Sequence, residues 1–323
     1  MLVFRSVANL RVAVVGAGSF GKNHVRVIHN SPHAELAGVF DTDSARAAEV
    51  AAPYSARVFN SLEELASVAD AAVVATPTVD HSAAGCRLME LGLDVLVEKP
   101  ISNTLKGAQA LVDAAARLGR ILQVGHLERF NPAILALESV MTVPLFFEVH
   151  RLSEFSPRSL DVDVVLDLMI HDLDILLSLT GKKPEEIRAA GISILSKKVD
   201  IANVRLQFPG GCIANITASR VSTERVRKLR LFQPHEYISL DYGRQDAVRF
   251  RVKPPTGIDF APLNIIKDEP LRLELEDFFE SIVSRRPPRV TGEQGLAALE
   301  VAQDILAKID EHAEVVAATL ASS

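Results

Sequence analysis

The segment DVDVVLDLMIHDLDILLSL, residues 161–179, combines the composition of a buried helix with side chains able to do acid–base chemistry. Asp163, Asp167 and His171 recur every four residues and Asp174 follows three later, so a helix would carry all four on one stripe. Buried carboxylates are costly unless they are paired, hydrogen-bonded or used in a reaction. The stripe therefore predicts a reactive Asp/His group, with a merely solvated helix face as the alternative.

A second reactive candidate is Lys99 in the segment VEKP, which ends a predicted strand. A lysine beside Glu98 at the carboxyl end of a parallel strand faces the edge of the sheet where ligands bind. Such a lysine can polarise a hydroxyl, or act as a general acid or base when its pKa is lowered. The alternative is a surface ion pair between Glu98 and Lys99. The sequence leaves open whether the bond to Pro100 is cis.

The segment VVGAGSFG indicates a site for a dinucleotide. It places Gly16, Gly18 and Gly21 in G-x-G-x-x-G spacing between a predicted strand and a predicted helix. These glycines permit, in turn, a tight turn, the approach of a pyrophosphate to the backbone, and packing of the helix on the strand. Ser19 and Phe20 would begin that helix, at the positive end of its dipole, beside the phosphates.

Asp41 follows the next predicted strand, where an acid accepts hydrogen bonds from the adenosine ribose. Its charge would repel the 2′-phosphate of NADP, and Arg46 is not immediately beside it, so NAD is expected rather than NADP. A turn residue or a helix N-cap is the alternative for Asp41. Thr76 and Pro77 end a further strand and are expected to line the cofactor, although TP is also simply a good helix start. His81 is expected near the cofactor, although alone it suggests a surface residue.

These residues require a sheet that brings several strand ends together. Predicted strands at 11–15, 34–40, 71–76, 94–100 and 121–126 alternate with helical patterns, which indicates βαβ units and a parallel sheet. Beyond His126, strand candidates follow one another from residue 145 to 242, with a hairpin turn at Pro209–Gly211. The predicted fold class is α/β: a Rossmann domain with a doubly wound parallel sheet (residues 1–124), and an α+β domain with a large, mainly antiparallel open sheet and C-terminal helices (residues 125–323).

Composition limits the function further. The chain has 323 residues, 48% hydrophobic and 24% charged, with a net charge of −6, which argues against a nucleic-acid partner. The basic run RVRKLR fits a strand with one solvated face. Two cysteines without CxxC spacing predict neither a disulfide framework nor a cysteine zinc site, and no metal is expected. The start does not resemble a signal peptide and no apolar run suggests a membrane partner, so a cytoplasmic location is expected.

The motifs GAGSFG, ATPTVDH and VEKP, with Asp41 and the D-x-x-x-H of the stripe, resemble those of the glucose–fructose oxidoreductase / inositol dehydrogenase / MocA family over nearly the whole chain. The resemblance implies a Rossmann domain, a second domain with a large open sheet, and NAD(P)-dependent chemistry at a sugar carbon. It makes Lys99, Asp167 and His171 the catalytic residues. His171 would take the hydroxyl proton, Lys99 would stabilise charge on the reacting oxygen, and Asp167 would orient His171 or contact a sugar hydroxyl.

The segment QVGHLERFNPA, taken with the stripe, resembles the branch of this family that oxidises C3 of UDP-N-acetylglucosamine. In that branch an aminotransferase then makes a 3-amino sugar for lipid A. Arginines are well shaped to hold the phosphates of such a substrate. The substrate candidates are Glu128, Arg129, Asn131, Arg151, Arg158 and Asp163. The resemblance also implies a homodimer or homotetramer. A dehydrogenase of a free polyol or simple sugar, and a non-catalytic dinucleotide sensor, remain as alternatives.

Overall fold

The computed structural model describes residues 10–155, 162–255 and 257–321, and the chain divides into two compact units. The first unit comprises the chain up to Leu127 together with Glu269–Leu296, and the second comprises Glu128–Asp268 and the chain from Ala297. The sequence had placed everything after residue 124 in the second domain, including the C-terminal helices.

The difference comes from helix α8 (Pro270–Ser284). Its apolar side chains, among them Leu275, Phe278 and Phe279, belong to the buried core of the first unit. An amphipathic pattern predicts that a helix has a buried face, but it does not identify the surface that covers that face. The return of the chain to the first unit was therefore not readable from the pattern.

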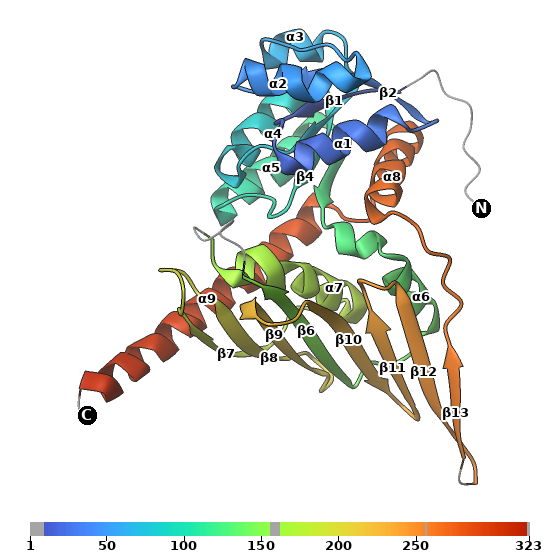
Figure 1. Ribbon diagram of the computed structural model, residues 1–323, viewed down its shortest axis with the longest axis vertical. Helices are drawn as coiled ribbons and strands as arrows, with labels where there is room; N and C mark the ends of the chain where they lie inside the picture. Colours follow the sequence, from blue (N-terminus) through green and yellow to red (C-terminus); the bar gives the residue numbers. More distant parts are fainter. Residues whose placement is uncertain (1–9, 156–161, 256, 322–323) are drawn as a thin grey trace. The chain divides into compact units, whose positions relative to one another are not determined.

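The first unit is built on a parallel sheet with strand order β2-β1-β3-β4-β5, and helices cover both of its faces (Figure 1). Its strands are nearly continuous apolar runs, such as AAVV in β3, as burial on both faces requires. The predicted doubly wound sheet is confirmed. The elements are β1 (Leu10–Val15), α1 (Ser19–His29), β2 (Ala34–Phe40), α2 (Ser44–Ala51), α3 (Leu62–Ala66), β3 (Ala71–Val74), α4 (His81–Glu90), β4 (Asp94–Glu98), α5 (Leu105–Leu118) and β5 (Leu122–Gly125).

The second unit contains an eight-stranded sheet in the order β13-β12-β11-β10-β6-β9-β8-β7. Neighbouring strands are antiparallel except β6 and β9, which are parallel because the chain leaves β6 through a helix and returns from the far edge. Pro209–Gly211 forms the predicted turn between β8 and β9. The strands are β6 (Phe146–Glu154), β7 (Glu186–Ile192), β8 (Ile201–Gln207), β9 (Ile213–Ser222), β10 (Val226–Gln233), β11 (Glu236–Asp241), β12 (Asp246–Lys253) and β13 (Gly257–Pro262).

Among the described residues, helices cover one face of this sheet and leave the other uncovered (Figure 1). They are α6 (Pro132–Val140), α7 (Ile170–Thr180) and the stretch Ala298–Ile309 of α9 (Gly292–Ala321). Alternate residues of the strands point into this core, as in β8, where buried and exposed side chains alternate. The sequence did not indicate α6, β12 or β13. Within the described residues, no helix is both long enough and apolar enough to cross a bilayer.

Candidate functional site

The first candidate site lies where β1 turns into α1. Gly16 has a φ of +100°, and a Cβ on it would lie 2.5 Å from the Ala75 carbonyl oxygen, so this tight turn excludes a side chain. A Cβ on Gly21 would collide with the Gly16 carbonyl oxygen, so α1 packs directly on the turn. A Cβ on Gly18 would meet nothing within 4 Å, so the space in front of it is open to a ligand. Each glycine has the surroundings that its place in the motif predicts.

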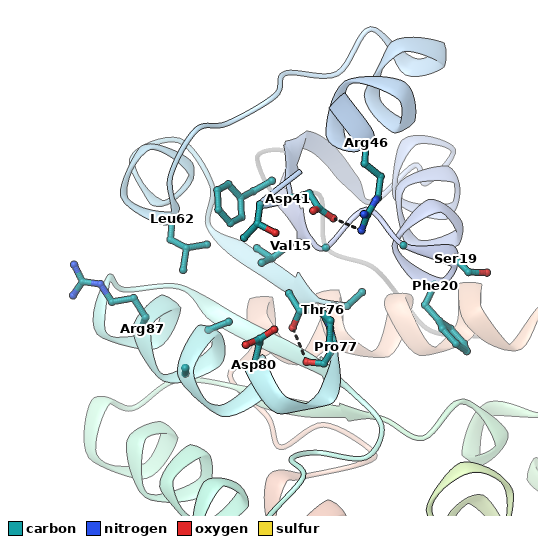
Figure 2. A pocket seen from close by; sticks show the side chains of 17 residues that line it. Val15, Ser19, Phe20, Asp41, Arg46, Leu62, Thr76, Pro77, Asp80 and Arg87 are labelled. Atoms are coloured by element: carbon teal, nitrogen blue, oxygen red, sulfur yellow. Dashed lines mark hydrogen bonds and ion pairs between the residues drawn. The ribbon is translucent and has the colours of Figure 1, made fainter. Parts of the chain in front are cut away.

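The N-terminus of α1 has the features of an anion site. Gly18 is its N-cap, no side chain caps the first turn, and that turn carries no acidic residue. The amides of the first turn therefore keep their donors for a ligand. Ser19 and Phe20 begin the helix, and the Phe20 side chain is exposed (Figure 2). A pyrophosphate fits this end of the helix by both hydrogen bonding and charge.

Asp41 is fixed beside the glycine turn by backbone donors. Its carboxylate accepts hydrogen bonds from the Ala17 amide at 2.7 Å and the Asp43 amide at 2.9 Å. Asp43, not Asp41, caps α2, so the N-cap alternative for Asp41 does not hold. Arg46 in the first turn of α2 places Nη1 3.9 Å from Asp41 Oδ2, which brings a basic group closer to Asp41 than the sequence indicated (Figure 2).

A cavity of about 610 Å³ opens in front of these residues (Figure 2). Its walls come from the carboxyl ends of β1, β2 and β3 and from the helices that follow them, where doubly wound sheets bind ligands. Its volume is typical of cofactor sites. Residues that line it and had been predicted are Gly16, Gly18, Ser19, Phe20, Asp41, Thr76 and Pro77. The sequence did not indicate Leu62, Asp80 or Arg87. Position after a strand could have revealed Asp80, whereas Leu62 and Arg87 reach the cavity only through the fold.

His81 is buried and does not line this cavity. Its Nδ1 lies 2.9 Å from the Pro100 carbonyl oxygen and its Nε2 lies 3.0 Å from the Thr76 carbonyl oxygen. Burial lowers the pKa of this imidazole, although the two carbonyl groups act to raise it. His81 thus joins the Thr76 segment, which lines the cavity, to the segment that carries Lys99. This is a positioning role, not the surface position or the cofactor contact considered from the sequence.

The segment around Lys99 is fixed by contacts with other residues of the first unit. The Lys99–Pro100 peptide bond is cis. Glu98 is buried, and its Oε1 lies 2.7 Å from His24 Nε2 on α1. The surface ion pair considered for Glu98 is therefore replaced by a buried contact with a histidine. This contact fixes the carboxylate of Glu98, which is the last residue of β4 and directly precedes Lys99 in the sequence.

In the second unit, the segment with the Asp/His stripe begins with a π-helical turn (Val165–Met169) and continues as α7. The Ile170 amide donates to the Val165 carbonyl, five residues back, and such wide turns are frequent at functional sites. Asp167 and His171 in this region are half-buried. Both side chains thus remain accessible in part, as the predicted catalytic residues must be.

Asp163 lies before the helical turn and differs from the rest of the stripe. Its Oδ1 accepts a hydrogen bond from the Val199 amide at 2.9 Å, and its Oδ2 lies 3.7 Å from Lys198 Nζ. These contacts attach it to the loop between β7 and β8. The geometry favours a structural role over the substrate contact suggested by the sequence.

The fully buried carboxylates of α7 are paired with arginines. Asp172, which lies off the predicted stripe, accepts hydrogen bonds from Arg151 Nε at 2.6 Å and Nη2 at 2.9 Å. Arg151 Nη1 also donates to Glu128 at 3.1 Å, and Arg129 Nη1 lies 3.4 Å from Asp174. Burial would lower the pKa of Arg151, but Asp172 and Glu128 raise it above its ordinary value. Pairing therefore explains the buried acids of this helix.

The ion pairs and hydrogen bonds of this buried network involve several residues that the sequence predicted to bind substrate. Arg151 and Arg129 are buried with their acidic partners, which argues against a role in holding substrate phosphates. Asn131 donates to Glu128 at 3.2 Å and to the Tyr242 carbonyl at 3.1 Å, so it belongs to the same framework. Arg158 lies outside the described residues.

Arg227 on β10 was assigned from the sequence only to a solvated strand. Its side chain is one-third exposed, and its Nη1 lies 3.5 Å from Glu128 Oε1. Burial and the charge of Arg151 lower the pKa of Arg227, although the charge of Glu128 acts to raise it. Arg227 is a partly accessible cation at the edge of the buried network.

Comparison with protein families gives two matches. A model described as an oxidoreductase family with an NAD-binding Rossmann fold matches residues 10–126, and a model of the GFO/IDH/MocA C-terminal domain matches residues 133–233. The first match covers the glycine turn, Asp41 and Lys99, and the second covers the part of the second unit from α6 to β10.

Individual relatives match over nearly the whole chain. The UDP-N-acetylglucosamine 3-dehydrogenase of Acidithiobacillus ferrooxidans is 35% identical over 94% of this chain and 98% of its own, and its solved structure superposes with a TM-score of 0.89, covering 94% and 99% of the two chains. The inositol 2-dehydrogenase of Rhizobium meliloti is 26% identical over 95% of this chain and 98% of its own. A putative myo-inositol dehydrogenase structure from Sinorhizobium meliloti, 24% identical over 94% and 98% of the chains with a TM-score of 0.78, shares the fold.

Proposed function

The chain belongs to the GFO/IDH/MocA family of NAD-binding oxidoreductases acting on CH–OH groups, and from this premise we propose that it oxidises the C3 hydroxyl of UDP-N-acetylglucosamine to a ketone. The observation that carries the substrate is the full-length similarity to the UDP-N-acetylglucosamine 3-dehydrogenase, at 35% identity. The product would be a 3-keto sugar nucleotide, which an aminotransferase could convert to a 3-amino sugar of the kind found in lipid A.

The proposed catalytic residues are Lys99 of the first unit and Asp167 and His171 of the second. His171 accepts the proton of the C3 hydroxyl as the hydride leaves the same carbon. Lys99 donates a hydrogen bond to the reacting oxygen and stabilises its developing negative charge. Asp167 orients His171 or holds a neighbouring sugar hydroxyl. When bound, the nicotinamide accepts the hydride.

We also propose that the cofactor is NAD rather than NADP. The support is Asp41, whose carboxylate is held at the cavity wall and would repel a 2′-phosphate. Arg46 nearby moderates this repulsion without removing it, because its side chain is half exposed and screened by solvent.

Substitution of Asp41 tests this choice. Asp41→Asn removes the charge, so the ratio of NAD to NADP efficiency should fall, by about tenfold or more if one hydrogen-bonded charge is lost. The measurement is kcat/KM with each cofactor. Asp43→Asn is the matched control, since Asn also caps a helix well and the residue does not line the cavity. An unchanged ratio in Asp41→Asn would remove this role for the residue.

A second candidate substrate is a free polyol such as inositol. The specific support is the inositol 2-dehydrogenase, which matches 95% of the chain at 26% identity. This alternative keeps the fold, the cofactor and the proposed catalytic residues, and changes only what binds beside them. It requires no group to hold a pyrophosphate, whereas the sugar-nucleotide substrate does, and Arg227 is a candidate for that task.

The deciding experiment is NADH formation by the purified protein with UDP-N-acetylglucosamine, N-acetylglucosamine or inositol. An aminotransferase should trap the ketone, because oxidation of an alcohol by NAD can be uphill near neutral pH. Turnover with the nucleotide sugar alone supports the proposal. Turnover with inositol and not with the nucleotide sugar would replace it by the second candidate.

The proposal includes a homodimer or homotetramer. It is supported by the uncovered face of the eight-stranded sheet, which presents a row of aromatic rings beside the ion pair of Glu148 with Arg230. Adjacent rings in this row have centroids 4.8–5.7 Å apart; the row comprises Phe146, Phe232, Tyr237, Phe250 and Phe260. An apolar surface of this kind is typical of an interface, and a second copy of the chain is the proposed occupant.

A further inference from the structure

Three buried titratable side chains meet next to the segment that carries Lys99. His24 comes from α1, Glu98 from the end of β4 and Glu274 from α8. One nitrogen or carboxylate oxygen from each lies within 4.8 Å of the others, and all three residues are buried. The sequence had not connected them, because they lie far apart in the chain.

The carboxylate of Glu98 is fully engaged. Its Oε1 lies 2.7 Å from His24 Nε2, and its Oε2 accepts a hydrogen bond from the Lys99 amide at 3.2 Å. A Cβ on Gly125 of β5 would lie 3.0 Å from the same Oε2, so β5 closes the other side. Glu98 therefore links a buried histidine to the backbone of the proposed catalytic lysine.

The carboxylate of Glu274 differs from that of Glu98 in its hydrogen bonding. Glu274 is completely buried, yet neither of its carboxylate oxygens has a hydrogen-bond partner among the described residues. The nearby Gln123 on β5 donates only to the Glu274 backbone carbonyl, at 3.0 Å. An ionised carboxylate left in this state would carry a large desolvation cost. The carboxylate of Glu274 must therefore bind either a proton or a metal ion.

The charges around the cluster indicate which of its two carboxylates binds a proton. Burial raises the pKa of Glu274 well above its ordinary value, and the charges of Glu98 and of Asp277 on its own helix raise it further. Burial would also raise the pKa of Glu98, but its hydrogen bond to His24, the charge of His24 and the charge of Lys99 bring it below its ordinary value. The groups around Glu274 are thus His24 on α1, Glu98 at the end of β4, Gln123 on β5 and Asp277 on α8.

A metal ion fits this cluster less well than a proton. Ligand atoms at about 2.1 Å from a tetrahedral ion are roughly 3.4 Å apart. The 2.7 Å between His24 Nε2 and Glu98 Oε1 is instead the length of a hydrogen bond between them. Two neighbouring carboxylates can share such a site when only one is ionised.

We propose that Glu274 is a positioning residue that carries a proton at neutral pH and so leaves Glu98 as the one negative charge of this three-residue cluster, held by His24 and the Lys99 amide. Ionisation of Glu274 would place a second negative charge beside Glu98 and disturb the segment before Lys99. The part of this inference that concerns turnover rests on the proposed function, whereas the part that concerns the proton does not.

The proton is tested by thermal unfolding of Glu274→Gln between pH 5 and pH 8. Because the pKa of Glu274 is raised in the folded state, the wild-type protein loses stability as the pH rises from the ordinary value near 4.5 toward the raised one. Glutamine does not titrate. The variant should therefore gain stability over the wild type as the pH rises, by up to about tenfold in the unfolding equilibrium constant per pH unit.

Controls separate this effect from packing and from metal binding. Glu293→Gln makes the same charge change at an exposed position of the first unit and should show no pH-dependent difference. A difference for Glu274→Gln that is constant from pH 5 to pH 8 would overturn the proposal. A chelator that lowers the unfolding temperature of the wild type would overturn it in favour of a metal ion.

The positioning role is tested by kcat as a function of pH. Glu274→Gln should keep the neutral-pH kcat within about twofold and lose a fall in kcat that the wild type shows at alkaline pH. If the stability signature appears but the alkaline fall persists, Glu274 holds the proton without positioning Lys99, and that part is overturned. Absence of turnover in the wild type would count against the proposed function alone, since the unfolding measurements still decide where the proton lies.

Discussion

Arg151 and Arg227 face each other on neighbouring strands but have different surroundings. Arg151 is buried with Asp172 and Glu128, whereas Arg227 keeps one-third of its side chain exposed. The burial of Glu128 would raise its pKa, yet the charges of both arginines hold that pKa below its ordinary value. At the residue scale, an arginine is thus assigned to structure or to ligand binding by its neighbours, not by its type.

A substitution of Arg151 distinguishes these roles. Arg151→Ala leaves Asp172 as an uncompensated buried charge, so the free energy of unfolding should fall by about 3–5 kcal/mol. Urea unfolding measures this loss. Arg227→Ala should change stability by less than about 1 kcal/mol, because its ion pair is partly exposed. If Arg151→Ala instead kept its stability and raised only the KM for a nucleotide sugar, the phosphate-binding role would be restored.

The proposed catalytic residues make a separate prediction. Lys99→Ala and His171→Ala should each lower kcat by about 10²–10⁴-fold, the usual contribution of a positioned acid or base, while NAD binding survives. Stopped-flow turnover and titration with NADH measure the two quantities. Lys106→Ala and His150→Ala are matched controls at exposed and partly exposed positions. Wild-type turnover in both active-site variants would make the assignment wrong.

At the scale of elements, the turn between β1 and α1 contains one glycine that the folded structure requires and another that ligand binding would require. Gly21 has no room for a methyl group because α1 lies on the Gly16 carbonyl, while Gly18 faces open space. Both positions are glycine in one motif, yet only one of them is required for the folded structure. The other is explained by the ligand that the open space would accept.

Two alanine substitutions test this distinction. Gly21→Ala should lower the free energy of unfolding by about 1–3 kcal/mol or more, as overpacking does. Gly18→Ala should change stability by less than about 0.5 kcal/mol, as expected for a site without steric conflict, but should weaken NAD binding by tenfold or more. Denaturant unfolding and NADH titration are compared for the same two proteins. Full cofactor affinity in Gly18→Ala would show that no phosphate approaches that position.

At the scale of the whole molecule, the uncovered face of the eight-stranded sheet is the feature that most needs a partner. Phe232 and Phe260 in its aromatic row remain exposed, at 37% and 61%, in the isolated chain. Exposed aromatic rows of this size favour association. Burying them against a second copy would remove them from water.

The double substitution Phe232→Glu with Tyr237→Glu should therefore shift the protein toward monomers. Charges at the centre of an apolar interface are costly, so sedimentation velocity should show a smaller species at equal concentration. Circular dichroism checks that the sheet is intact. Lys106→Glu, an exposed change outside this sheet, serves as the control. A wild-type protein that is already monomeric would contradict the proposed oligomer directly.

The sequence alone determined the parallel sheet, the glycine turn and the place of Asp41 beside it. These features depend on local patterns: continuous apolar strands, fixed glycine spacing, and an acid at a strand end. The family motifs were readable for the same reason, since each lies within a few consecutive residues. Lys99, Asp167 and His171 remain predictions that depend on those motifs.

Only the tertiary structure decided which acids are paired, which arginines are buried and which helix completes the first unit. Asp172 lies on no stripe with Asp167 and His171, yet Arg151 from a distant strand neutralises it. Glu274 comes beside His24 and Glu98 through the return of α8. Desolvation and pairing are properties of surroundings built from distant segments, so a side chain's charge state and accessibility follow from the fold and not from the local sequence.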